Sequence, residues 1–176
     1  MAPTYEFNTP EGQKIDRSKL VACMNTASKE APVWSIVGIG VSSSQTDMDW
    51  KRESETDITG RVTNRMSKPT VTQSFDPWPL AAGDPALRFV WEKGIMDEDA
   101  QALCNVDMLI VHMYAGTAGS AVLGVRYESC SVEVNSFGGD GGANIAMPIT
   151  VTYGGTRTKG SVSGSEGKFV FTPDAE

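Results

Sequence analysis

The stretch from Asp47 to Thr63 alternates regularly along the chain. All of its odd-numbered residues are polar, whereas its even-numbered positions include several large apolar residues, which are Met48, Trp50, Ile58 and Val62. A period of two is typical of a β-strand with one solvated face. The stretch therefore predicts a long β-ribbon, and we expect the ribbon to turn near residues 52–55.

The solvated face of this ribbon is acidic. Between residues 47 and 57 it carries five acidic residues and one lysine; the acids are Asp47, Asp49, Glu53, Glu55 and Asp57. Their place in a row on a solvated strand offers nothing that would shift their pKa values as catalysis requires. We therefore interpret the row as an electrostatic surface rather than as a catalytic pair.

Other segments also predict strands. Their apolar patterns cover residues 33–41, 69–75, 106–114, 123–134 and 145–153, with a last hairpin in 156–173. Residues 106–114 are apolar on both faces, which predicts a central strand covered on both sides. The apolar parity of residues 123–134 changes near Tyr127, which predicts a bulge.

One helix is strongly indicated between residues 84 and 94. Asp84 is a good N-cap and Pro85 suits the first helical position. An apolar stripe follows at spacings of three and four, formed by Leu87, Val90 and Trp91, and Gly94 is expected to end the helix. A second short helical piece is expected within residues 97–104. The fold class that follows is mainly β (α+β), a sandwich or barrel with one flanking helix.

The chain divides into an arm and one domain. Residues 1–31 are polar and punctuated by Pro3, Pro10 and Gly12. We expect them to form an N-terminal arm that becomes ordered against a partner, with residues 19–24 as one helical turn or an edge pairing. Residues 32–176 are expected to form a single domain.

Composition narrows the class further. The chain has 176 residues, 40% hydrophobic content and 18 glycines, which fits one turn-rich globular β domain. A net charge of −7 argues against a nucleic-acid-binding protein, because binding to phosphates requires basic residues. No run of 18 apolar residues exists and no signal peptide is evident, so we expect a protein made in the cytoplasm without a membrane span. The three cysteines (Cys23, Cys104 and Cys130) are far apart and are expected to be reduced, mostly buried thiols.

Candidate catalytic chemistry is sparse. The single histidine, His112, lies in the most apolar strand, where a satisfied core histidine is favoured over a catalytic base. The sequence GSVSG at residues 160–164 lacks the central serine of a nucleophile elbow, and GGDGG at 138–142 lacks the acidic ligands of a calcium turn. We expect no enzymatic activity, no cofactor and no metal site.

The exposed edges of such a ribbon require a partner, because a free strand edge promotes aggregation. In the order of its features the chain resembles the tail tube (major tail) proteins of long-tailed bacteriophages. The residues that carry this resemblance are the ribbon with its flanking strands (33–75), the GDPALRFVWEKG helix (83–94), the VDMLIVHMY strand (106–114) and residues 127–155. The resemblance spans roughly residues 33–164.

The resemblance implies a β-sandwich or split barrel whose copies form hexameric rings. The inner strands of the subunits would join into one shared barrel, and stacked rings would form the channel for DNA ejection. Asp47, Asp49, Glu53, Glu55 and Asp57 would then face the lumen and repel DNA, while the even face would pack against the rest of the subunit. The other reading is a solvated strand on the outside of an ordinary sandwich.

The same resemblance implies assembly contacts and partners. Trp78 and Leu80 would be exposed anchors at subunit interfaces, although Trp78 could instead cap its own core, and Tyr5 and Phe7 would contribute from the arm. Expected partners are further copies of the chain, tape-measure and tail-tip or terminator proteins, and DNA in transit, with no membrane, in a virion tail. Alternatives are the inner tube of a contractile tail or of a phage-tail-like bacteriocin, and a monomeric carbohydrate-binding β-sandwich.

Overall fold

A computed structural model describes residues 5–165 and 168–174. The expected mainly β fold with one flanking helix is confirmed. In chain order the elements are η1 (Arg17–Lys19), β1 (Leu20–Asn25), β2 (Trp34–Ile36), β3 (Thr46–Asp49), β4 (Arg52–Thr56), β5 (Val62–Met66), β6 (Thr70–Phe75), α1 (Pro85–Trp91), η2 (Glu92–Met96), α2 (Ala100–Cys104), β7 (Val106–Thr117), β8 (Ala121–Val134), β9 (Ile149–Tyr153), β10 (Arg157–Ser163) and β11 (Val170–Pro173).

Part of the body is a small antiparallel barrel. Its strands follow one another as β2-β1-β7-β8-β10-β11, and a bridge between Trp34 and Phe169 joins the two ends. The interior is filled by apolar side chains from these strands, among them Val21, Cys23, Leu109, Val111 and Val162. Closing the barrel removes the strand edges that an open sheet would leave.

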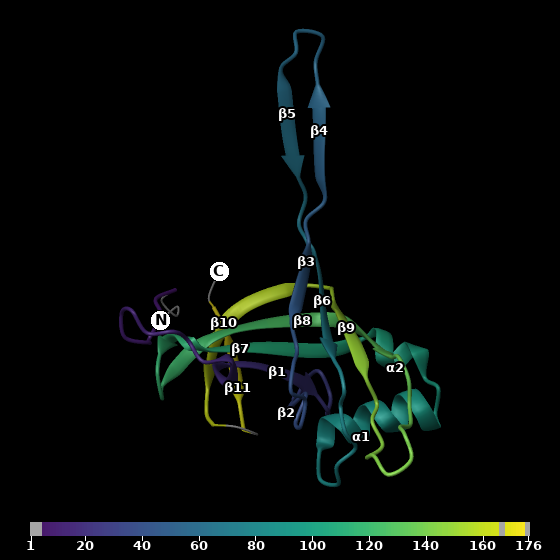
Figure 1. Cartoon of the computed structure of the whole chain (residues 1–176). Helices are drawn as coiled ribbons and strands as arrows, with labels where there is room; N and C mark the ends of the chain where they lie inside the picture. The colour runs from purple at the N-terminus through teal and green to yellow at the C-terminus, as the bar shows by residue number, and fades with distance from the viewer. Residues whose placement is uncertain (1–4, 166–167, 175–176) are drawn as a thin grey trace.

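The long strand β8 links this barrel to a second group of strands. Its residues 122–127 pair with β10, and its residues 131–134 pair with β9. Between these two parts the register with β7 shifts, since Val106 pairs with Cys130 but Met108 pairs with Tyr127. The expected bulge near Tyr127 is therefore confirmed. From β9 the pairing continues through β6 to β3, the strand that leads out of the body (Figure 1).

A second core lies between the body strands and α1. On β1, Val21 and Cys23 face the barrel interior, whereas Ala22 and Met24 face this second core. The strand β7 likewise contributes to both cores, as its apolar pattern predicted. Both strands hold the centre of the fold because side chains on each of their faces are removed from water.

The position of β1 corrects the division into arm and domain. Residues 20–25 lie within the span that we expected to be an arm, yet they form a buried strand between β2 and β7. The apolar run Leu20–Met24 is too short to be recognised as a central strand without knowledge of its partners. Only the segment before η1 remains available as an arm, and its residues 1–4 lie outside the described residues.

The helix signal is confirmed at its start and wrong at its end. Asp84 caps α1 through a 3.1 Å hydrogen bond from the Leu87 backbone N–H to its carboxylate, and Pro85 is the first helical residue. Gly94 does not end the helix, because the chain continues as the π-helical turn η2. A Cβ at Gly94 would lie 2.9 Å from a methyl group of Val134, so this glycine permits close packing on β8.

Two further expectations need correction. The strand expected over residues 33–41 ends at Ile36, because Gly38 and Gly40 adopt left-handed φ angles of 92° and 83°. Trp78 is completely buried in the second core beside Phe75, with ring centroids 6.4 Å apart. Trp78 is therefore a core residue of its own subunit and not an exposed anchor.

Candidate assembly surface

The most distinctive feature of the molecule is a two-stranded ribbon, residues 46–73, that projects from the body (Figure 1). Its base is formed by β3 and β6, and its distal part by β4 and β5. Asp49 pairs with Thr70 and Arg52 pairs with Met66, so two residues on one strand oppose three on the other. This bulge joins the two parts and lets the ribbon bend as it leaves the sheet.

The ribbon turns at residues 57–60, and the expected turn at 52–55 is wrong. The Asp57 carboxylate accepts hydrogen bonds from the Thr59 hydroxyl at 2.6 Å, the Thr59 N–H at 2.8 Å and the Arg61 N–H at 3.0 Å. These bonds lower the pKa of Asp57 below its ordinary value. Gly60 supplies the left-handed φ of 81° that the turn needs. Asp57 therefore holds the turn in addition to its place in the acidic row.

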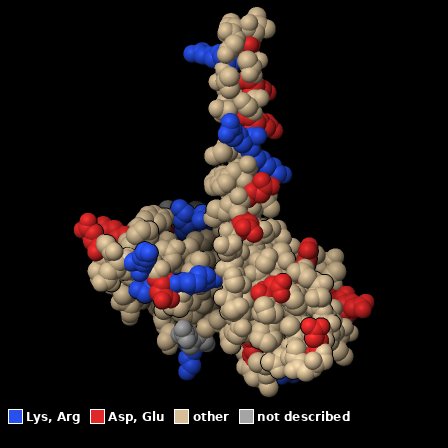
Figure 2. All heavy atoms as spheres, viewed as in Figure 1, with Lys and Arg blue, Asp and Glu red and all other residues tan. Residues whose placement is uncertain are grey.

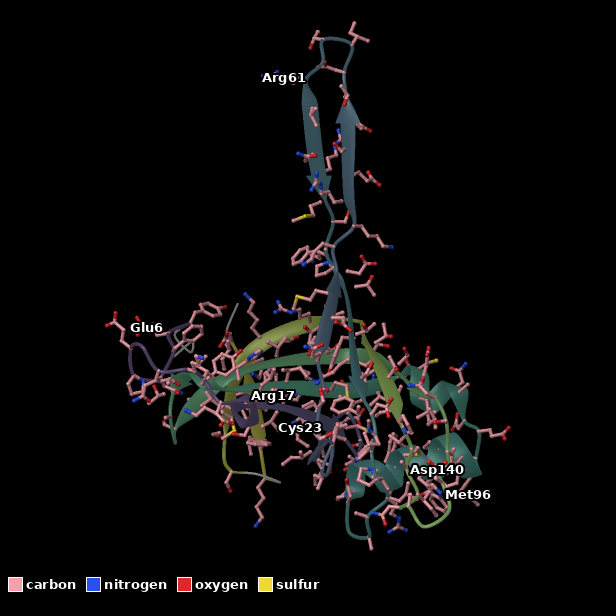
Figure 3. All side chains as sticks on the ribbon, viewed as in Figure 1. Glu6, Arg17, Cys23, Arg61, Met96 and Asp140 are labelled. Atoms are coloured by element: carbon pink, nitrogen blue, oxygen red, sulfur yellow. The ribbon has the colours of Figure 1, made fainter. Side chains whose placement is uncertain are left out.

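The ribbon is exposed on both faces. Every residue from Gln45 to Lys68 is exposed. This includes large apolar residues that keep 50 to 106% of their surface in water, namely Met48, Trp50, Ile58, Val62 and Met66. The expectation that the even face packs on the rest of its own subunit is therefore wrong, because the ribbon extends away from the body that would cover it (Figure 3).

Charges are separated between the two strands of the ribbon. The outgoing strand carries all five acids together with Lys51 and Arg52, whereas the return strand, residues 61–73, carries Arg61, Arg65 and Lys68 and no acid. The register places Glu53 opposite Arg65, so both lie on one face. Acidic side chains line one side of the ribbon in Figure 2, and Arg61 points away on the other side in Figure 3.

Basic residues on the return strand make the ribbon less negative than the acidic row alone predicted. Over residues 46–73 the ribbon holds five acidic and five basic residues, the latter being Lys51, Arg52, Arg61, Arg65 and Lys68. Its acidic face holds five acids with three bases, Lys51, Arg61 and Arg65. The ribbon predicted from the sequence ended at Thr63 and therefore did not include Arg65. A turn predicted at the sequence Asp-Ile-Thr-Gly, residues 57–60, would have placed Arg65 on this face.

A groove of about 640 Å³ lies where the ribbon meets the body. The ribbon contributes Met48 and Trp50 to this groove, and the body contributes Tyr127 and Tyr153, whose ring centroids are 5.0 Å apart. Lys68 and Arg157 also line it. Sequence reasoning could not find this groove, since its walls come from separate parts of the chain.

The remaining expected interface residues behave differently from one another. Tyr5 and Phe7 are exposed at the end of β7, where Phe7 bridges to Ala115 and the Tyr5 hydroxyl lies 3.1 Å from the Lys159 ammonium. Leu80 is half-buried beside α1. Tyr5 and Phe7 therefore present aromatic surface to solvent.

The residues considered for chemistry lie apart from the ribbon. His112 is half-buried, and its Nδ1 lies 2.8 Å from the Tyr114 hydroxyl. Desolvation and the nearby Arg157 charge lower the pKa of His112. Burial raises the pKa of Cys23 to about 12 and that of Cys130 to about 11, whereas Cys104 is exposed. Over residues 5–165 and 168–174, no group of three or more potential metal ligands occurs, and no helix is long and apolar enough to cross a membrane.

No protein-family model matches the sequence, and no curated protein matches it either. Solved structures similar to the chain include the tube-terminating cap of the anti-feeding prophage, with 16% identity, a TM-score of 0.46 and coverage of 86% of this chain and 94% of that chain. A chain of the sheath–tube complex of PVC, an extracellular contractile injection system, gives 14% identity and a TM-score of 0.48, with coverage of 85% of this chain and 93% of that chain. A chain of the sheath/tube terminator of the same system gives 13% identity and a TM-score of 0.49, with coverage of 85% of this chain and 99% of that chain.

Proposed function

We propose that this chain is a structural subunit whose copies assemble through their ribbons into rings that stack into a hollow tube. The observation that carries the proposal is the continuous exposure of residues 45–68 with their large apolar side chains. A two-stranded ribbon is marginally stable alone in water. Its free edges and apolar surface favour a state in which another chain covers them.

A further copy of the chain is the partner that fits the ribbon best. Copies related by rotation about one axis place their ribbons side by side, all pointing the same way, and closing the ring leaves no free edge. The sequence resemblance to phage tail tube proteins favours six copies per ring, stacked rings, and contacts with tape-measure and terminator proteins. The chain would then form part of the conduit for DNA.

The ribbon's length favours contacts between rings. Because its distal part projects beyond its own body (Figure 1), the surface that covers Val62 and Met66 must come from another copy. With the ribbons parallel to the tube axis, a copy in the adjacent ring would lie in the direction in which the ribbon points. The exposed Tyr5 and Phe7 would add to this contact through the arm.

The acidic face of the ribbon would line the bore. Five acids against three bases leave two negative charges per copy on that face, which repel passing phosphates. Tubes of the D47K/D49K variant should therefore retain DNA in a co-sedimentation assay, whereas wild-type tubes should not. If the variant tubes retain no DNA, these carboxylates do not face the bore.

Two alternatives are distinguished by different measurements. The inner tube of a contractile tail or of a bacteriocin would bind a sheath protein on its outer surface. A monomeric carbohydrate-binding module would need exposed aromatic residues in a row on the body. Trp34 and Trp78 are buried, Trp91 is half-buried and Trp50 lies on the ribbon, so the described part of the chain offers no tryptophan row of this kind.

Size-exclusion chromatography followed by negative-stain imaging tests the proposed function. We expect rings or hollow tubes from the wild-type chain. A variant in which Asn-Gly replaces residues 52–66 should remain folded and monomeric, because the Ser67 N–H donates to the Lys51 carbonyl at 3.0 Å and the cut ends are adjacent. A wild-type chain that stays monomeric at every concentration would refute the proposal.

A further inference from the structure

The distal ribbon, residues 52–66, has two chemically different edges. On one face, β4 presents Glu53 and Glu55, and the return strand presents Arg61 and Arg65. The sheet of β4 and β5 contains these two strands alone among the described residues. Each strand therefore has one edge free for a neighbour. On the face that carries Glu53 and Glu55, the edge of β4 is acidic and the edge of the return strand is basic, while Arg52 of β4 lies on the opposite face.

Two ribbons can meet in three ways, and the charges distinguish them. Pairing β4 with β4 of another copy brings glutamates together, and pairing β5 with β5 brings arginines together. Pairing β4 with β5 brings glutamates beside arginines. Like charges on neighbouring strands destabilise a sheet and opposite charges stabilise it. The two symmetric pairings are thus disfavoured, and the unsymmetric pairing is favoured.

We propose that this charge separation specifies head-to-tail assembly, in which β4 of one copy pairs with β5 of the next. Rotation about a common axis produces this contact and makes it antiparallel, because within each ribbon β4 and β5 run in opposite directions. The two glutamates of each β4 then have arginines on both sides. One pair of arginines belongs to the same ribbon, and the other pair belongs to the neighbouring copy. The separation also opposes two-fold dimers, which would stop ring closure. This inference rests on the proposed function and adds the rule by which copies recognise one another.

Two charge-reversed variants test the rule when they are mixed. In E53K/E55K both edges are basic, and in R61E/R65E both edges are acidic. Each variant alone should require at least about a tenfold higher concentration for assembly than the wild type. In an equimolar mixture the two variants can alternate around a ring with an even number of copies, and every contact between ribbons again joins opposite charges.

The mixture isolates the contact between copies. Contacts within each ribbon are the same alone and mixed, so a defect in folding cannot be rescued by mixing. The control E92K/D140K makes the same change in net charge as E53K/E55K, at exposed positions of the body, and it should assemble like the wild type. Asp140 lies at the end of the body far from the ribbon (Figure 3).

The result expected is that the mixture assembles near the wild-type concentration, while each variant alone requires at least about a tenfold higher concentration. Head-to-tail recognition is overturned if either variant alone assembles at the wild-type concentration. It is also overturned if the wild type assembles but the mixture does not. A wild-type chain that fails to assemble refutes the proposed function itself, so the two failures are distinguishable by light scattering of the three samples.

Discussion

Replacing apolar residues of the ribbon with serine should weaken assembly without weakening the fold. Met66 is 64% exposed and Val62 is 56% exposed. More than half of each side chain therefore remains to be buried. Full burial of such side chains contributes about 1.5–3 kcal/mol each, so covering the remaining surface of both contributes about 3 kcal/mol per copy. Losing this contribution in V62S/M66S corresponds to a roughly hundredfold higher concentration for assembly.

The assay compares assembly with subunit stability. The concentration at which half of the protein is assembled is measured by light scattering, and the free energy of unfolding is measured by urea titration below that concentration. The latter should change by less than about 0.5 kcal/mol, because both side chains are already exposed in the single chain.

The control for this experiment is a methionine of similar exposure elsewhere. Met96 is 60% exposed and lies far from the ribbon (Figure 3), so M96S should leave both quantities unchanged. The reasoning is refuted if V62S/M66S assembles at the wild-type concentration. It is also refuted if M96S and M66S raise that concentration equally.

Three further predictions concern the body. Deleting residues 1–15 should leave a folded subunit that assembles poorly, whereas deleting residues 1–31 should prevent folding, because it removes the buried strand β1. Circular dichroism distinguishes the folded variant from the unfolded one, and native spectra for both would contradict the placement of β1. Trp78→Ala should lower the free energy of unfolding by about 3–5 kcal/mol, as measured in urea on the chain lacking residues 52–66; a loss below about 1 kcal/mol would contradict burial of this residue. The pKa of His112 is lowered from 6.5 by burial and by Arg157, so its contribution to stability is present above about pH 6.5 and is lost as pH falls further; His112→Gln should flatten this part of the pH profile, and an unchanged profile would contradict the assignment.

Local signals in the sequence predicted local structure well. Asp84 and Pro85 marked the start of the helix, because a cap and a proline act on the backbone directly beside them. The change of apolar parity near Tyr127 predicted the bulge in β8, because side chains alternate strictly along a strand. These features depend on neighbours in the chain, so the chain alone reveals them.

Features that depend on distant packing were not predicted. Alternation between residues 47 and 63 showed that the ribbon has two faces, but it cannot tell whether the apolar face is covered by the same chain or by another copy. Trp78 stands between two prolines, outside any helix or strand pattern, and only the approach of β6 and α1 buries it. The position of Arg65 opposite Glu53 was not predicted, because the position of the turn decides which residues of the return strand lie opposite the acids.

Hydrogen–deuterium exchange of the ribbon tests the central claim most directly. In the monomer, amides on the free edges of β4 and β5 should exchange rapidly, while those of the buried strand β7 stay protected. On assembly we predict that exchange within residues 52–66 slows by at least about a hundredfold while β7 is unchanged. Equal exchange of residues 52–66 in the monomer and in the assembled protein would contradict assembly through the ribbon.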